Sequence, residues 1–138
     1  MMGQDGFEYC HYVFSIRNRL PVFGNLELET RLRELIIEIC QEKGFDIDVF
    51  EIMEEHVHLL IRRKLSDQHR YIMKSIKGIS SKRVFEFEPS LKLDIGADHL
   101  WARGYWVEGV PPEKLEAVRH YIRNQKKASY GDECPRTE

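Results

Sequence analysis

Four stretches of this chain show the pattern of β-strands. Residues 8–17 are rich in aromatic and β-branched side chains, and residues 45–53 alternate apolar with acidic positions. Residues 56–63 follow a two-residue turn and are the expected hairpin partner of the second strand. Residues 100–110 predict a fourth strand, bent around Gly104.

Three other stretches repeat apolar residues at helical spacing. Residues 26–43 carry leucine and isoleucine on one stripe, with Asn25 as a candidate N-cap and Gly44 as the stop. Residues 66–87 predict a second helix, capped by its first serine, and residues 113–127 predict a third that begins after two prolines. We expect the apolar stripes to pack in the core.

The predicted order is strand, helix, strand, strand, helix, strand, helix, with a loop over residues 88–99. This order indicates an α+β fold in which helices pack on one face of an antiparallel sheet. The arrangement is the split βαβ (ferredoxin-like or RRM-like) one, followed by a C-terminal helix. A chain of 138 residues is expected to form one domain, here residues 8–127, with flexible ends at residues 1–7 and 128–138.

Composition narrows the class of protein. The hydrophobic fraction of 42% and the charged fraction of 32% are typical of a soluble globular chain, and no apolar run approaches a membrane span. The polar N-terminus carries no signal-peptide pattern. Cys10, Cys40 and Cys134 are scattered without paired spacing, so we expect reduced thiols and a cytoplasmic protein.

Charge is distributed unevenly although the net charge is only −2. Residues 27–55 hold ten acidic side chains, whereas residues 62–83 are strongly basic, and a second basic group follows on the last helix. One side of the molecule could therefore attract phosphates, although a solvated helix face would show the same pattern. The candidate DNA-binding residues are Arg62, Arg63, Lys74, Lys77, Lys82, Arg83 and Arg123.

Two features within the predicted elements leave alternatives open. Gly78 inside a helix weakens it by up to ~1 kcal/mol relative to alanine, so either tight packing on the sheet or a close approach by nucleic acid would explain it. Trp101, Tyr105 and Trp106 could stack on unpaired bases, but aromatic residues in a strand are more often core or dimer contacts.

The strongest candidate chemistry lies in the third strand, at His56 and His58. Alternate residues of a strand face the same side, so these two imidazoles face together and Val57 and Leu59 face the core. Two imidazoles on one strand can lean onto one cation at roughly 2.1 Å each. A lone His-x-His is nevertheless more often a pair of half-buried histidines.

A second constellation stands on the last predicted helix. Tyr121 and Gln125 are four residues apart and therefore neighbours on one face. Together with His56 and His58 they supply two imidazoles, an amide oxygen and a phenol. That set suits a divalent cation with open positions for phosphate oxygens, and Mg²⁺ or Mn²⁺ fits best.

At these residues the chain resembles a known family, the single-tyrosine HUH transposases of the smallest insertion sequences (TnpA-like proteins). The resemblance covers residues 8–127, and family members carry Asp where Glu55 stands and a different run at residues 102–106. The matching motifs are HYVFSIRNRLPVF at the first strand, EHVHLL at residues 55–60, KSIKGISSKR at residues 74–83, HLWARGYWV at residues 99–107 and YIRNQ at residues 121–125.

The resemblance implies an activity and a site. Tyr121 would attack single-stranded DNA and form a 5′-phosphotyrosine link, while His56, His58 and Gln125 would hold the metal. The substrates would be hairpins near the ends of an insertion element. The protein would act as a homodimer, without a nucleotide cofactor or a membrane partner.

Three other functions are considered from the sequence alone. The first is a domesticated relative that acts on hairpins of chromosomal repeats. The second is a non-catalytic module that binds single-stranded nucleic acid, which would need neither Tyr121 nor a metal. The third is a metal hydrolase of small molecules, which the absence of an acidic ligand beside His56 and His58 disfavours.

Overall fold

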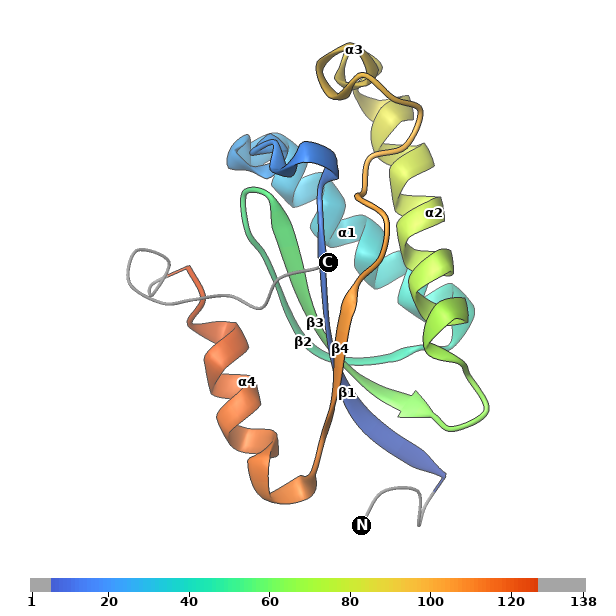
Figure 1. The fold of residues 1–138 in the computed structure, drawn as a ribbon, viewed down its shortest axis with the longest axis vertical. Helices are drawn as coiled ribbons and strands as arrows, with labels where there is room; N and C mark the ends of the chain where they lie inside the picture. Colours follow the sequence, from blue (N-terminus) through green and yellow to red (C-terminus); the bar gives the residue numbers. More distant parts are fainter. Residues whose placement is uncertain (1–5, 127–138) are drawn as a thin grey trace.

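The computed structural model describes residues 6–126, which form a four-stranded antiparallel sheet with helices on both faces (Figure 1). The order across the sheet is β2 (Asp46–Ile52), β3 (His56–Lys64), β1 (Phe7–Ser15) and β4 (Trp106–Val110). Every neighbouring pair is antiparallel. The order is that of the split βαβ arrangement, so the predicted fold class is confirmed.

Two long helices cover one face of this sheet (Figure 1). The first, α1 (Leu26–Lys43), has the predicted bounds because both of its ends are set locally. The Asn25 side chain accepts a hydrogen bond from the backbone nitrogen of Leu28, and Gly44 takes the left-handed conformation, φ 75°, that ends the helix. The second is α2 (His69–Phe87).

The main core lies between these helices and the sheet. It takes alternate residues of the two central strands, as the period of a strand requires. These residues are Cys10, Tyr12, Phe14, Val57, Leu59 and Ile61.

The opposite face is covered by α4 (Leu115–Arg123), which follows the short helix η3 (Pro112–Lys114). Figure 1 shows α4 on the side of the sheet away from α1 and α2. Ile122 packs there against Leu60 and Val110 in a second, smaller cluster. The sheet is therefore a layer between two helix layers, and the His56 side of β3 faces α4.

The bounds predicted for two helices, and the loop predicted over residues 88–99, differ from the structure. The second helix begins at His69 rather than at residue 66, and Gln68 holds its N-cap position without a side-chain hydrogen bond. The predicted loop over residues 88–99 contains α3 (Leu91–Ile95), a single turn whose two end residues are buried. That stretch is too short for helical periodicity to mark it. The last helix, predicted over residues 113–127, begins at Leu115 and ends at Arg123.

The predicted bend of the last strand is a full interruption. Only β4 keeps ladder pairing, while Trp101 forms an isolated bridge with Ile16. Between them the carbonyls of Ala102 and Gly104 accept hydrogen bonds from Lys77 Nζ, at 2.9 and 2.7 Å. Lys77 of α2 thus contacts the segment that joins Trp101 to β4, a long-range contact that the local pattern does not indicate.

Two residues of the predicted flexible start, Gly6 and Phe7, are described by the structure. Phe7 is the first residue of β1, and the Arg62 guanidinium lies 3.6 Å from its ring centroid. The remainder of the predicted flexible ends, residues 1–5 and 128–138, lies outside the described residues. Among the helices of residues 6–126, none has the length and apolar character needed to span a bilayer.

Candidate active site

The His56 and His58 side chains lie together on the α4 side of β3. Both are buried, and their Nε2 atoms are 3.2 Å apart. The intervening Val57 belongs to the core on the other face. The predicted orientation of the two imidazoles is therefore confirmed.

This pair has the geometry of two ligands of one cation. Nitrogens 3.2 Å apart that each lie ~2.1 Å from a common ion subtend an angle of roughly 100° at that ion, close to both octahedral and tetrahedral values. Burial lowers the pKa of His56, and it lowers the pKa of His58 to about 2. Both imidazoles are thus neutral at pH 7 and have a lone pair for a divalent ion.

A third imidazole, that of His11, supports the pair from β1. Its Nε2 lies 3.0 Å from His58 Nδ1. When His58 Nδ1–H donates to His11 Nε2, the proton is on Nδ1 and His58 Nε2 is left for the cation. An outer hydrogen-bond partner of this kind orients a metal-binding histidine and fixes its tautomer. His11 is not among the residues predicted from the sequence, although its place between the apolar Cys10 and Tyr12 puts it on the same sheet face as the pair.

An acidic group lies on the outer side of His56. Glu55 Oε1 is 3.4 Å from His56 Nδ1, without a hydrogen bond between the two atoms. Arg19 Nη2 donates a hydrogen bond of 2.9 Å to Glu55 Oε2. Arg19 is the last residue of the helical turn η1 (Arg17–Arg19) and has φ 51°. Burial would raise the pKa of Glu55, but the hydrogen bond from the Arg19 guanidinium lowers that pKa below its usual range. A carboxylate at this distance suits a metal-bound imidazole.

Tyr121 on α4 is brought against the same imidazoles. Its ring centroid lies 5.8 Å from that of His58 and 6.1 Å from that of His11, both edge to face. Its ring also packs on the Leu60 cluster that holds α4 to the sheet. The helix of this chain thus places a phenol beside the histidine pair of the same chain.

Gln125 was predicted on the same helix as Tyr121, but α4 ends at Arg123 and Gln125 lies in the turn that follows. Its side chain is buried, and its Nε2 donates to the Tyr121 carbonyl at 3.2 Å. The bond ties the amide to the segment that carries the phenol. Gln125 as a metal ligand remains a prediction.

Two groups of ion pairs hold α4 and the turn after it, and they involve cations of the basic group that the sequence places on the last helix. Arg119 pairs with both carboxylate oxygens of Asp48 on β2, at 2.9 and 2.8 Å. Lys126 pairs with Glu29 of α1 and lies 3.8 Å from Glu51 of β2. Part of the basic C-terminal group therefore neutralises acidic residues of the chain itself.

The seven candidate DNA-binding residues divide by environment. Lys74, Lys82 and Arg123 are exposed, and Arg83 is half-buried at 3.7 Å from Glu38. The others are engaged within the chain: Arg62 over the Phe7 ring, Arg63 with Glu8, and Lys77 on backbone carbonyls.

A basic pocket of about 780 Å³ opens between α2 and the segment before β4. The cations that line it are Arg17, Lys77, Lys82, Lys92 and Arg103. Gly78 also lines it, and a Cβ built at Gly78 would meet no atom within 4 Å. Tight packing on the sheet therefore does not explain this glycine.

Of the three aromatic candidates for base stacking, Trp101 is a core residue. It is buried, its ring packs edge to face on Phe14 at 4.7 Å, and its Nε1 donates to Ser80 Oγ at 2.9 Å. Tyr105 packs partly against the main core. Trp106 is half-buried with its ring 5.0 Å from that of His11.

The buried histidines predict an acid-sensitive fold. Burial lowers the pKa of His11 to about 4, whereas an unfolded histidine titrates near ~6.5. Between these values the unfolded chain binds a proton that the folded chain does not, so stability present above pH ~6.5 is lost as the pH falls toward ~4. His11 alone contributes a loss of about 3 kcal/mol.

Urea unfolding of the metal-free protein near pH ~7 and near pH ~4 measures this loss. His11→Gln removes one titrating group, so its stability is expected to fall less over the same range. An equal fall in both proteins would contradict the contribution assigned to His11.

Comparison with known proteins finds similarity to transposases of insertion sequences. A family model described as "Transposase IS200 like" matches residues 8–125. The ISDra2 transposase TnpA of Deinococcus radiodurans is 26% identical over 115 residues, which cover 83% of this chain and 81% of that protein. The transposase for insertion sequence element IS200 of Salmonella typhimurium is also 26% identical over 115 residues, covering 83% and 74%.

Two solved structures share the fold. A crystal structure described as that of a transposase from Deinococcus radiodurans superposes with a TM-score of 0.70 at 26% identity, covering 86% of this chain and 91% of that one. The structure of a REP-associated tyrosine transposase bound to a REP hairpin superposes with a TM-score of 0.60 at 17% identity, covering 90% and 68%.

Proposed function

This chain belongs to the IS200-like transposase family, and on that premise we propose that it cleaves and rejoins single-stranded DNA through a bond between Tyr121 and a 5′ phosphate. One observation carries the proposal: the Tyr121 ring lies 5.8 Å from the ring of His58, one of two buried imidazoles with facing Nε2 atoms. A nucleophile and a metal-binding pair at one place are what phosphodiester chemistry of this kind needs.

The step that we assign to Tyr121 is a displacement at phosphorus. Its Oη forms a bond to phosphorus and gives its proton to solvent, while the bond from phosphorus to the 3′ oxygen breaks and that oxygen takes a proton from solvent to become a 3′-hydroxyl. The reverse attack by a 3′-hydroxyl rejoins DNA and releases the tyrosine. Because the phosphodiester energy is held in the covalent link, no ATP is required.

His56 and His58, with Gln125 as a third ligand, would hold a divalent cation, Mg²⁺ or Mn²⁺. A phenol has a pKa near ~10 in water, so it is a poor nucleophile at pH 7 without help. The bound cation would supply stabilisation of the charge that develops on the phosphate. His11 would keep His58 in the tautomer that leaves Nε2 available, from its position 3.0 Å from Nδ1.

We propose hairpin-forming single strands at the ends of an insertion element as substrates, bound by a homodimer. The structural neighbour bound to a REP hairpin shares this fold. The basic pocket beside α2 is our candidate for the DNA contact, since it combines Lys82, Lys92 and Arg103 with open space at Gly78. Phosphate contacts of this kind make affinity fall steeply with salt.

The function is tested by incubating the protein with labelled single strands that carry an end hairpin, with Mn²⁺ or with EDTA. We expect a protein–DNA adduct that survives denaturation, only with single strands and only with the metal. Binding without any adduct would instead favour the non-catalytic module. An adduct formed on chromosomal repeat hairpins but not on element ends would favour the domesticated relative.

Gly78→Ala is expected to change the stability of the fold and the affinity for DNA in opposite directions. An alanine within α2 is expected to stabilise the protein by about 0.5–1 kcal/mol, because it is the better helix former and its Cβ meets no atom within 4 Å. The same methyl group would enter the pocket, so we expect hairpin affinity to fall roughly fivefold, equivalent to about 1 kcal/mol.

Thermal unfolding and fluorescence anisotropy with a labelled hairpin measure the two effects of Gly78→Ala. Ser75→Ala, at a half-buried position of α2 that does not line the pocket, is the control and should leave affinity unchanged. A stability gain at Gly78 without any loss of affinity would contradict the pocket as a DNA contact.

A further inference from the structure

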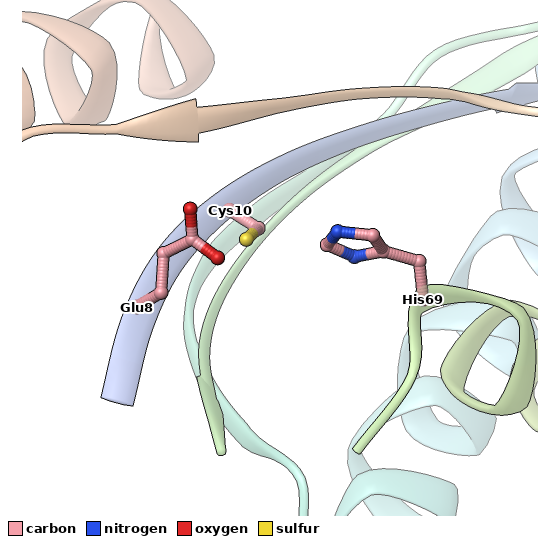
Figure 2. Close-up of side chains that lie close together, drawn as sticks. All are labelled: Glu8, Cys10 and His69. Atoms are coloured by element: carbon pink, nitrogen blue, oxygen red, sulfur yellow. The ribbon is translucent and has the colours of Figure 1, made fainter. Parts of the chain in front are cut away.

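A second group of metal-ligating side chains lies on the sheet face opposite the histidine pair. Figure 2 shows Glu8, Cys10 and His69 turned toward one another, and their candidate ligand atoms all lie within 4.8 Å of each other. Glu8 and Cys10 are two residues apart on β1 and so share a face. His69 is the first residue of α2. The group therefore joins the start of a central strand to the start of a helix.

The three side chains form a ligand set suited to zinc. A thiolate, an imidazole and a carboxylate are the groups that bind Zn²⁺ in proteins, and thiolate selects softer cations over Mg²⁺. Ligand atoms of a tetrahedral zinc lie about 3.5 Å apart, so side-chain shifts of about 1 Å bring this group into range. A water molecule can fill the fourth position.

The neighbours of the group hold two of its members in place. Tyr12 Oη lies 2.8 Å from His69 Nδ1, and when Nδ1–H donates to it, His69 Nε2 is left as the ligand. Arg63 donates to Glu8 Oε1. A carboxylate has about four lone-pair sites, so Glu8 can accept from Arg63 and still bind a cation. Figure 2 shows a carboxylate oxygen of Glu8 directed toward the Cys10 sulfur.

The charges around the group decide which ion it takes. Arg63 is positive and only 12% of its side chain is exposed, so a cation that adds charge without displacing a proton is disfavoured. Burial raises the pKa of the Cys10 thiol to about 11, against an opposing hydrogen bond from Arg63. A thiophilic cation removes the thiol proton to solvent on binding, which lowers the net charge that is added. A hard ion such as Mg²⁺ has no such compensation.

We propose that Glu8, Cys10 and His69 bind a zinc-class divalent cation that ties β1 to the first turn of α2. On binding, the Cys10 S–H bond is broken, its proton goes to solvent, and sulfur donates its electron pair to the ion. The site is separate from the His56 and His58 pair, which faces the other side of the sheet. It would stabilise the fold and leaves the cleavage chemistry to the other site.

Cobalt(II) titration of the reduced full-length protein tests the site. A thiolate ligand gives an intense near-ultraviolet sulfur-to-cobalt charge-transfer band, whereas an ion held by His56 and His58 does not. We expect the band in the wild type and its loss in Cys10→Ser. A Cys40→Ser/Cys134→Ser variant keeps Cys10 as its one thiol, of three in the chain, and should retain the band.

His69→Gln gives a second, milder variant, because this histidine is only half-buried. We expect it to bind Co²⁺ at the thiolate site at least about tenfold more weakly while keeping the wild-type circular dichroism spectrum. If Cys10→Ser fails to fold, the Co²⁺ affinity of His69→Gln decides whether the cation binds at this site. Absence of the band in the wild type, its persistence in Cys10→Ser, or unchanged affinity in His69→Gln would overturn the proposal.

Discussion

Tyr121→Phe is expected to abolish adduct formation and lower strand cleavage on the order of 10⁴-fold or more, as the loss of a nucleophile typically does. Phenylalanine keeps the ring that packs beside His58 and on the Leu60 cluster, so fold and hairpin affinity should be unchanged. Only the oxygen that would bond to phosphorus is removed.

A gel assay for the covalent adduct, with hairpin binding measured on the same preparations, checks the Tyr121 prediction. Tyr9→Phe is the matched control, because Tyr9 is another tyrosine of the same small cluster under α4 and its phenol has no assigned role. The control should cleave like the wild type. Adduct formation by Tyr121→Phe at the wild-type rate would show that another residue attacks the phosphate.

His58→Gln is expected to weaken Mn²⁺ binding strongly and to lower cleavage by about 10²–10³-fold. His58 is fully buried between His56 and His11, and glutamine cannot present a nitrogen 3.2 Å from His56 Nε2 while also contacting His11 Nε2. The loss should therefore appear in metal affinity as well as in rate.

Electron paramagnetic resonance of Mn²⁺ gives the affinity of each variant without reference to activity. His120→Gln is the control, because His120 is exposed on α4 and hydrogen bonds to Asn124 rather than to the site. His120→Gln should bind Mn²⁺ like the wild type. Wild-type affinity in His58→Gln would place the metal elsewhere.

The sequence predicted those features whose causes are local. The bounds of α1 follow from a capping asparagine and a left-handed glycine at its two ends. The shared orientation of His56 and His58 follows from the period of a strand. The fold class follows from the order of the elements, each of which is marked by a pattern over several residues.

The missed features depend on residues far apart in the chain. His11 meets His58 across 47 positions, and Arg119 meets Asp48 across 71. At the break before β4, Lys77 donates hydrogen bonds to two backbone carbonyls, those of Ala102 and Gly104. Periodicity contains no information on such pairs, so they became visible only in the fold.

The periodicity of apolar residues likewise could not predict that Tyr121 lies beside the histidines. Its predicted role came from the resemblance to a family, and the spacing to Gln125 showed only that the two share a helical face. In the structure Gln125 lies past the helix end, and the pairs made by Arg119 and Lys126 fix the position of α4.

Tryptic digestion of the covalent adduct, after nuclease trimming, identifies the residue that carries DNA. Cleavage after Arg119 and Arg123 yields a four-residue peptide, His-Tyr-Ile-Arg, in which Tyr121 is the one tyrosine. We predict that mass spectrometry finds a 5′-phosphonucleotide on this peptide and that fragmentation places it on Tyr121. A nucleotide on any other residue or peptide would contradict the site described above.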